Sequence, residues 1–145
     1  MIYKSTDISE YVLGYIYKTK EYRINVLQLM DILYFVQAQF LVNKNLRAFA
    51  EDIVAKDWSV FIESVWRKYK IYCNSIIPVH INNFDNVCKK IYHSDALLVN
   101  DVVILIHGSS WKLMNIIREQ TPYINGLNNY PTFTITDTDM KKFFS

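Results

Sequence analysis

Four side chains of this sequence have the chemistry to bind zinc or to act in nucleophilic catalysis. Cys73, His80, Cys88 and His93 are separated by six, seven and four intervening residues. A tetrahedral zinc site usually contains at least one close pair of ligands, as in CxxC or HExxH, and neither pair occurs here. A cysteine nucleophile would also need a third group that orients its histidine. We therefore interpret these residues as buried thiols and ordinary surface histidines.

Two further motifs carry oxygen groups that could serve a divalent ion or an acyl-transfer reaction. Asp137 and Asp139 stand beside Thr136, where they fit the first turn of a helix and its dipole better than a metal site. The segment 107–110, His-Gly-Ser-Ser, lacks the strand and glycine context of a nucleophile elbow and is interpreted as a helix-to-helix turn. Three scattered glycines cannot form a phosphate-binding loop. The sequence thus predicts no catalytic residue, no metal and no cofactor.

A cluster of basic and aromatic residues between positions 66 and 72 could stack on nucleic acid. On a helix, however, its aromatic side chains share the apolar face with Ile62 and Val65, whereas its cations point elsewhere. The formal net charge of +2 also gives no strong field for a polyanion, and it excludes an acidic DNA mimic. Nucleic acid is therefore not expected as the primary partner. The aromatic members of the cluster are Trp66, Tyr69 and Tyr72, and the basic members are Arg67, Lys68 and Lys70.

Composition indicates a single domain of 145 residues, long enough to bury a core without disulfides or metal. With 11 Tyr, 8 Phe and 3 Trp, the chain has either an aromatic-rich core or an aromatic interface, and the sequence leaves both open. The longest apolar run, residues 96–106, is interrupted by Asn100 and Asp101 and falls short of the ~20 residues that span a bilayer. We expect a cytoplasmic protein with free thiols and without a membrane segment.

The strongest structural signal is an apolar helix between Leu27 and Leu41. A capping box marks its start, because the Asn25 side chain can accept from the amide of Gln28 while Gln28 reaches back to the amide of Asn25. The apolar residues recur at three- and four-residue steps and therefore line one face of the helix, which we expect to be core. They are Leu29, Ile32, Leu33, Val36 and Phe40.

The remaining pattern predicts a mainly α fold, a compact single-domain bundle of about six helices with a small β element. A strand near residues 51–55 is expected to pair with a second strand at residues 132–135. Gly108 is a natural left-handed helix end, and Thr121-Pro122 is expected to stop a helix before a loop around Asn125-Gly126. The other helix starts are expected at Asp7 with Glu10, Ser59, Asn83 or Asp85, Ser94, Ser110, and Thr136 with Asp139.

Three ordered motifs resemble those of the Panacea antitoxin family of phage-associated proteins. The order Leu27-x-Leu29-x-x-Ile32-Leu33-Tyr34-Phe35, with Gln37 after it, is similar to the signature helix LKLQKLLYF-x-Q. Residues 135–144 are similar to the closing motif I-x-x-E-x-I-K-x-Y-F. Residues 51–72 are similar to the central motif E-x-I-x-A-W-x-x-G-P-V-x-x-x-V-Y-x-x-Y-K-x-Y-G, with Glu51, Ile53, Ala55, Val65, Tyr69, Lys70 and Tyr72 in register and Trp66 at an aromatic position.

The chain departs from these motifs at two places. Ser59-Val60 stands where the family has Gly-Pro, and Met30-Asp31 stands where the signature helix has Gln-Lys. Glycine and proline fix unusual backbone dihedrals, so their replacement implies a differently shaped loop or a helix that starts earlier.

The resemblance implies a non-enzymatic protein-binding module that neutralises a partner toxin by gripping it directly. Two alternatives stay open: a phage or mobile-element inhibitor of a host defence complex, of the anti-CRISPR type, and a nucleic-acid-binding regulator. Tight inhibition by a protein needs a few large, desolvated side chains in a shape-matched patch. The sequence leaves homo-oligomerisation open. The candidate partner-binding residues are Tyr34, Gln37, Trp58, Trp66 and Trp111.

Purified protein is expected to contain no stoichiometric metal ion and to need none for folding, because no ligand pattern in the sequence favours a metal. Elemental analysis, together with thermal unfolding with and without a chelator, checks this expectation. One zinc ion per chain and unfolding by the chelator would contradict it.

Overall fold

Helix α2 (Val26–Lys44) lies at the centre of the protein and packs against elements from both halves of the chain. The computed structural model describes residues 2–106 and 110–145, and this part of the chain contains eight α-helices, one short 3-10 helix and three strands. The mainly α fold with a small β element is confirmed, with eight helices in place of about six. The other elements are α1 (Ser5–Lys20), β1 (Ile53–Ala55), β2 (Val60–Phe61), α3 (Glu63–Tyr69), η1 (Lys70–Tyr72), α4 (Ile81–Cys88), α5 (His93–Leu105), α6 (Ser110–Arg118), α7 (Thr121–Leu127), β3 (Thr134–Ile135) and α8 (Asp137–Phe144).

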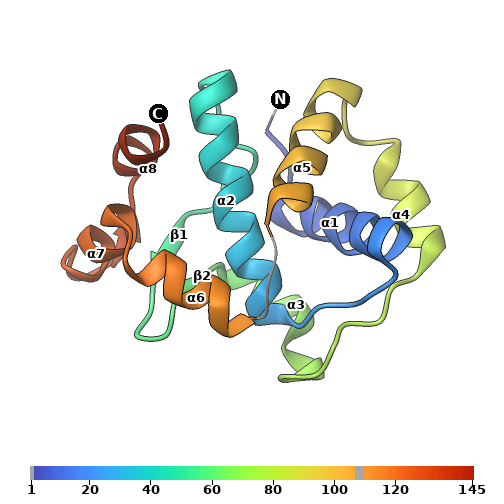
Figure 1. Ribbon diagram of the computed structural model, residues 1–145, viewed down its shortest axis with the longest axis horizontal. Coiled ribbons are helices and arrows are strands. Elements are labelled where there is room, and N and C mark those ends of the chain that lie inside the picture. The colour runs from blue at the N-terminus through green and yellow to red at the C-terminus, as the bar shows by residue number, and fades with distance from the viewer. Residues whose placement is uncertain (1, 107–109) are drawn as a thin grey trace.

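The elements surround α2 on several sides (Figure 1). Helices α1, α4 and α5 lie on one side of α2, and α7 and α8 lie on the other, while α6 crosses near its N-terminal end. The predicted capping box is present, since the Gln28 amide donates to Asn25 Oδ1 at 2.9 Å and the Asn25 amide donates to Gln28 Oε1 at 3.1 Å. The five residues of the predicted core face are all buried. Met30, Tyr34 and Ala38, outside that face, are also fully buried, so α2 is covered nearly all round.

Burial also accounts for the apolar character of α2. Among the described helices, α2 alone is long and apolar enough to cross a membrane by length and composition. However, 67% of its most apolar window is buried inside the protein. The apolar side chains of α2 are therefore covered mostly by other elements of the protein.

The three strands form one antiparallel sheet in the order β2-β1-β3. Ile53 pairs with Ile135 and Val54 with Thr134, which confirms the predicted pairing of residues 51–55 with 132–135. Strand β2 was not expected, because Ser59 was predicted to cap a helix. Instead Val60 and Phe61 pair with β1, and α3 begins only at Glu63.

Several helix starts differ from the predicted ones, whereas one is confirmed. The Thr136 side chain caps α8 as predicted, accepting from the Asp139 amide at 3.1 Å. In contrast, α1 begins at Ser5, two residues before Asp7, and the hydroxyl of Ser5 donates to Glu51. Thr121-Pro122 starts α7 rather than ending α6, because proline lacks only an amide hydrogen that the first helical turn does not need.

Three further boundaries also moved. Helix α4 begins at Ile81, ahead of both predicted capping residues Asn83 and Asp85. Helix α5 begins at His93 with Tyr92 as its N-cap, so Ser94 lies inside the first turn. The loop predicted around Asn125-Gly126 is part of α7. The predicted helix end at Gly108 and the turn that contains it lie outside the described residues.

Gly14 lets helices α1 and α4 approach closely. A Cβ atom at this position would lie 2.2 Å from Cδ1 and 2.7 Å from Cβ of Phe84. Alanine normally favours a helix interior by ~1 kcal/mol over glycine, but forced overpacking costs ~1–3 kcal/mol. Since the contact includes the Phe84 Cβ atom, which rotation of the ring cannot move away, we expect the steric term to be the larger one.

Gly14→Ala is therefore expected to lower the melting temperature. The same substitution in a Phe84→Ala background should cost less, because the ring that meets the new methyl group is gone. Thermal unfolding of the four proteins of this cycle provides the measurement. A Gly14→Ala protein that melts above the parent would show that the two helices do not pack this closely.

Candidate partner-binding site

The turn between β1 and β2, residues 56–59, is held at both ends by hydrogen bonds from the core. The amide of Lys56 donates to the carbonyl oxygen of Ser59 at 2.7 Å and closes the turn. The hydroxyl of Tyr123 donates to the carbonyl oxygens of Lys56 and Asp57, the latter at 3.2 Å. At the other end, the buried hydroxyl of Ser59 donates to Asp31 Oδ1 at 2.8 Å. The turn is thus fixed in the free protein.

Trp58 stands on this fixed turn, between the two points of attachment. Its side chain is 40% exposed, as a partner-binding residue requires. A large aromatic side chain on a rigid turn can contact a partner at little cost in backbone entropy. Trp58 is therefore accessible to a partner protein, and the hydrogen bonds of the turn fix its backbone position.

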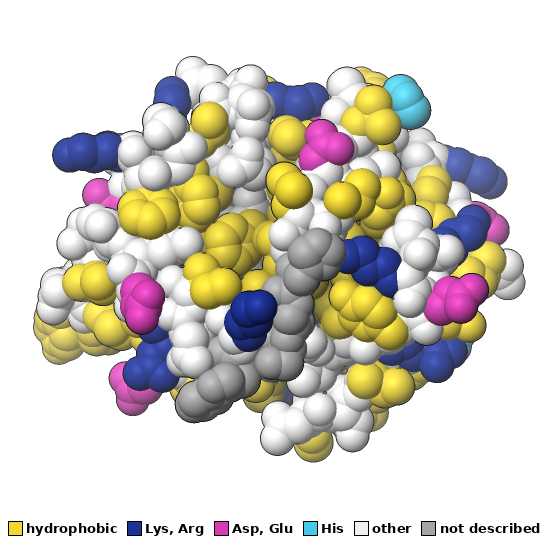
Figure 2. Space-filling view, viewed as in Figure 1, with side chains coloured by type: hydrophobic (Ala, Val, Ile, Leu, Met, Phe, Trp, Pro, Cys, Tyr) yellow, Lys and Arg dark blue, Asp and Glu magenta, His cyan; other side chains and the backbone are white. Residues whose placement is uncertain are grey.

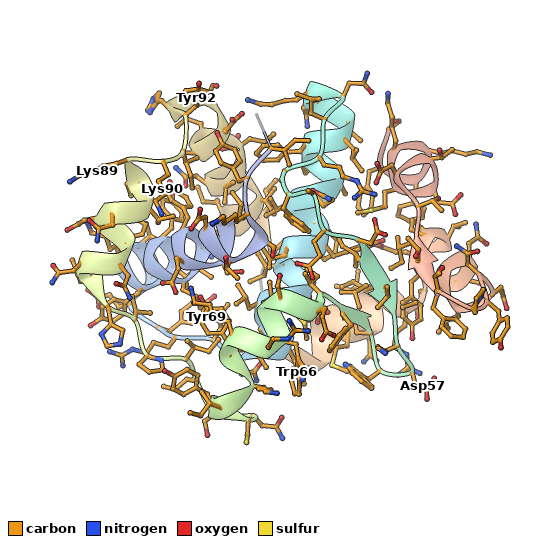
Figure 3. All side chains as sticks on the ribbon, turned by 180° about the vertical axis from the view of Figure 1, so that it is seen from behind. Asp57, Trp66, Tyr69, Lys89, Lys90 and Tyr92 are labelled. Atoms are coloured by element: carbon orange, nitrogen blue, oxygen red, sulfur yellow. The ribbon has the colours of Figure 1, made fainter. Side chains whose placement is uncertain are left out.

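An apolar hollow of about 420 Å³ adjoins Trp58 and brings together four parts of the chain: the β1–β2 hairpin, α3 with the segment after it, the first turn of α2, and α6. We call this feature the aromatic hollow. The rings of Phe61 and Trp66 lie 6.0 Å apart with a 47° tilt, and Lys56 Nζ lies 5.0 Å from the centre of the Phe61 ring. Trp66 and Asp57 lie at the same end of the molecule in Figure 3. The hollow is lined by Leu27, Lys56, Trp58, Phe61, Trp66, Asn74 and Met114.

Glu51 fixes the start of α3 and with it the position of Trp66. The N-cap residue Ile62 has no side-chain acceptor, and Glu51 Oε2 accepts from the amide of Ser64 at 2.8 Å instead. The other carboxylate oxygen accepts from the hydroxyls of Ser5 and Ser64. A carboxylate at a helix N-terminus also interacts favourably with the helix dipole. One acidic side chain therefore joins the starts of α1 and α3.

The two departures from the Panacea motifs meet beneath the hairpin. Asp31 accepts from Ser59, and the neighbouring Met30 accepts from the amide of Ile62 through its sulfur at 3.4 Å. The pair Met30-Asp31 therefore contacts both ends of the segment 59–62. Asp31 and Ser59, which are 28 positions apart in the sequence, thus belong to one packed contact in the structure.

Asp31 is fully buried, and its Oδ2 has no hydrogen-bond partner among the described residues. Burial raises the pKa of this carboxyl to about 7, although the hydrogen bond from Ser59 acts in the opposite direction. A carboxylate in such surroundings is costly to ionise, because no cation of the described residues compensates its lost hydration.

The predicted partner-binding residues fall into two groups. Tyr34 and Gln37 are buried, with exposed fractions of 0% and 2%, and they stabilise the fold. The hydroxyl of Tyr34 donates to Gln120 Oε1 at 2.8 Å, and burial raises its pKa. By contrast, Trp58 is exposed and Trp66 is half-buried, and the structure brings them together in the aromatic hollow. The side chain of Trp111 lies outside the described part of the structure.

Gln37 holds the loop that follows α2. Its Oε1 accepts from the amides of Ala48 and Phe49 at 2.7 and 3.2 Å, and its Nε2 donates to the carbonyl oxygen of Phe49 at 2.9 Å. The same loop pairs with the N-terminal segment through Tyr3. The prediction that Gln37 contacts a partner is therefore wrong; its side chain is buried and fixes the loop after α2.

Sequence reasoning missed Leu27, Phe61, Asn74 and Met114 as members of the hollow. Phe61 was placed on a helix that does not form there. The run Val60-Phe61-Ile62 is apolar throughout, so its alternating burial is visible only in the structure. Asn74 reaches the hollow only because the chain turns back after η1. No local pattern marks such a residue.

The face assignment for α3 is confirmed. Val65 and Tyr69 are buried and Trp66 is half-buried, whereas Arg67 and Lys68 are exposed. The hydroxyl of Tyr69 donates to Glu10 at 2.7 Å, and burial raises its pKa. The buried Tyr69 ring is therefore occupied by packing and is not available to stack on a base.

The cysteine and histidine residues do not form a cluster. Cys73 and Cys88 are both exposed, so the interpretation as buried thiols was wrong. His80 and His93 are exposed, as expected for surface histidines. Among the residues that the structure describes, no group of three or more His, Cys, Asp or Glu side chains is arranged to hold a metal ion. Asp137 instead pairs with Arg47 at 2.9 Å.

No protein-family model, curated protein or solved structure matches this chain. The candidate site consists of a fixed hairpin turn, an exposed tryptophan and the aromatic hollow beside it.

Stability is expected to fall as the pH rises from about 4 to about 7, because of Asp31. The carboxyl has a pKa of about 7 in the folded chain, and the ordinary value of ~3.9 applies in the unfolded chain. Between these values the unfolded state binds fewer protons, so unfolding releases a proton and stability decreases with pH, by at most ~1.4 kcal/mol per pH unit. Asp31→Asn should flatten this slope, as measured by thermal unfolding at several pH values. An identical slope in both proteins would contradict the assignment.

Proposed function

We propose that this chain is a non-enzymatic protein-binding module of the antitoxin type, which neutralises a toxin in the cytoplasm by binding it directly. The observation that carries the proposal is the position of Trp58, which is 40% exposed on a fixed turn. One end of this turn is bonded to Tyr123, and the other end is bonded to Asp31 through Ser59. Together with the aromatic hollow it forms the surface to which we assign the partner.

The physical reason lies in how tight protein interfaces gain their free energy. Most of that free energy comes from a few large side chains, tryptophan and tyrosine above all, that become desolvated in a well-packed pocket. Trp58 and the half-buried Trp66 are such side chains, and the hollow between them has room for an apolar side chain of a partner. Because the turn is already fixed, little ordering entropy is lost on binding.

The lining of the hollow also indicates the chemistry of the partner. Five of its residues are apolar or aromatic, and the two polar ones are Lys56 and Asn74. No ion pair joins Lys56 to an acidic group among the described residues; its ammonium group lies over the Phe61 ring. A partner side chain that enters the hollow next to a carboxylate would satisfy both features.

The resemblance to the Panacea motifs supports an antitoxin rather than another inhibitor. The departures from those motifs, Met30-Asp31 and Ser59-Val60, pack against each other under the hairpin that carries Trp58. We infer that they set the shape of this hairpin and therefore the choice of toxin. The scaffold would then be shared with the family while the contact surface is particular to this chain.

Trp58→Ala is expected to leave the fold nearly intact and to weaken toxin binding by ~2 kcal/mol or more, which is about thirtyfold in affinity. Growth rescue from the co-expressed product of the neighbouring gene, measured alongside thermal unfolding, separates the two effects. Leu33→Ala is the stability control: at 0% exposure it should cost ~2–5 kcal/mol of folding free energy and reduce rescue only through the amount of folded protein.

Tyr92→Ala is the matched surface control. Tyr92 is 60% exposed and lies at the opposite end of the molecule from Trp66 in Figure 3, so its removal should change neither rescue nor stability. The proposal fails if Trp58→Ala unfolds the protein while Leu33→Ala is silent, or if the Trp58 and Tyr92 variants rescue equally well.

A further inference from the structure

A second apolar surface lies between α2 and α5, away from the aromatic hollow. This α2–α5 groove has a volume of about 360 Å³, and its apolar lining comes from Phe35 of α2 and from Leu98, Val102, Leu105 and Ile106 of α5 and the residue after it. Figure 2 shows hydrophobic side chains gathered over α2 and α5 on this face, with an acidic side chain among them. Leu105 is 78% exposed and is therefore available to a partner.

The floor of the groove is fixed before any partner binds. The Phe35 ring meets the rings of Tyr34 and Phe144 edge-on, at centroid distances of 5.2 and 5.9 Å. Phe144 belongs to α8, so the C-terminal helix holds Phe35 in place from the side opposite α5. Val102 is buried and completes the floor.

The two leucines of α5 give the groove a length that matches two turns of a helix. Leu98 and Leu105 are seven residues apart, which corresponds to two helical turns and ~10 Å along the axis. A helix that presents apolar side chains at positions i, i+3 or i+4, and i+7 spans the same length. Asp101 lies between the two leucines, on the same face of α5.

Charge decides what kind of helix fits. Asp101 is exposed, and no cation pairs with it among the described residues, whereas Asp95 at the start of the same helix is paired with Lys44. On the α2 rim, both amide hydrogens of Asn43 are used by Gln39, whose backbone and side-chain oxygens accept at 2.9 and 3.1 Å. Asn43 therefore offers a partner its carbonyl oxygen. The carboxylate of Asp101 on one rim and the carbonyl oxygen of Asn43 on the other can therefore both accept hydrogen bonds from a lysine or arginine of a partner.

The same charge argues against a second copy of this chain. In a two-fold pairing of α5 with α5 across the groove, Asp101 lies midway between Leu98 and Leu105 and would face its own symmetry mate. Two carboxylates at the centre of an apolar contact repel each other and lose their hydration. A partner helix that carries Lys or Arg at this level would instead form an ion pair.

We propose that the α2–α5 groove binds an amphipathic helix of a protein partner, with apolar residues seated against Phe35, Leu98 and Leu105 and a lysine or arginine paired with Asp101. This surface is distinct from the aromatic hollow, so a partner could occupy both or either one alone. The proposal does not depend on Trp58.

The test uses two labelled peptides of about 18 residues, long enough for several helical turns. One has leucines at helix-face spacing flanked by lysines, and the other has glutamate in place of each lysine. Fluorescence anisotropy should show that the lysine peptide binds the parent protein, and that Leu105→Ser and Asp101→Lys each weaken this binding at least about tenfold. Asp101→Lys should also make the glutamate peptide bind more tightly, because the charge pair is exchanged rather than removed.

Ile71→Ser is the matched control, since Ile71 is equally exposed at 78% and lies in η1. It should leave peptide binding unchanged, as should Trp58→Ala, which separates this proposal from the aromatic hollow. The inference is overturned if the lysine peptide shows no saturable binding, or if both peptides bind every variant alike. A dimer in sedimentation that Leu105→Ser dissociates would assign the groove to a second copy and overturn it as well.

Discussion

The burial of α2 on nearly every side is the constraint on which the rest of the structure depends. A polar side chain on the covered part of this helix cannot bond to water, so it must find a partner within the protein. Gln37 bonds the loop after α2, Tyr34 donates to the connection between α6 and α7, and Asp31 accepts from the β1–β2 turn. These three buried side chains therefore attach three loops to the central helix.

This attachment links the core to the surface that we assign to the partner. The turn that carries Trp58 is bonded to α2 at Ser59 and to α7 at Tyr123, so its position follows from the packing of two helices rather than from turn propensity. The aromatic hollow forms where this turn, α3 and the first turn of α2 meet. On the other face, the same helix supplies Phe35 to the groove beside α5. One central element thus serves two separate surfaces.

Much of the fold was predictable because local signals and packing agree. The capping box at Asn25, the cap at Thr136 and the pairing of residues 51–55 with 132–135 follow from side-chain chemistry and β-propensity, and the structure confirms them. Periodicity identified one core face of α2, but it could not reveal that the remaining faces are covered too. Tyr34 and Gln37 were for that reason assigned to a surface. Ser59 was misassigned because a serine before an apolar run is compatible with a helix cap and with a buried hydrogen bond to a distant carboxyl, and only tertiary contact selects between them.

We infer that side chains of α2 hold the adjoining loops as firmly as the core itself, and native-state hydrogen exchange measures whether they do. The amides of Ala48 and Phe49, which donate to Gln37, and of Ile62, which donates to Met30, are the reporters. We predict that they exchange only through global unfolding, as slowly as amides in the middle of α2. Exchange of these amides at the rate of exposed loops would contradict the claim, because the loops would then open independently of the helix.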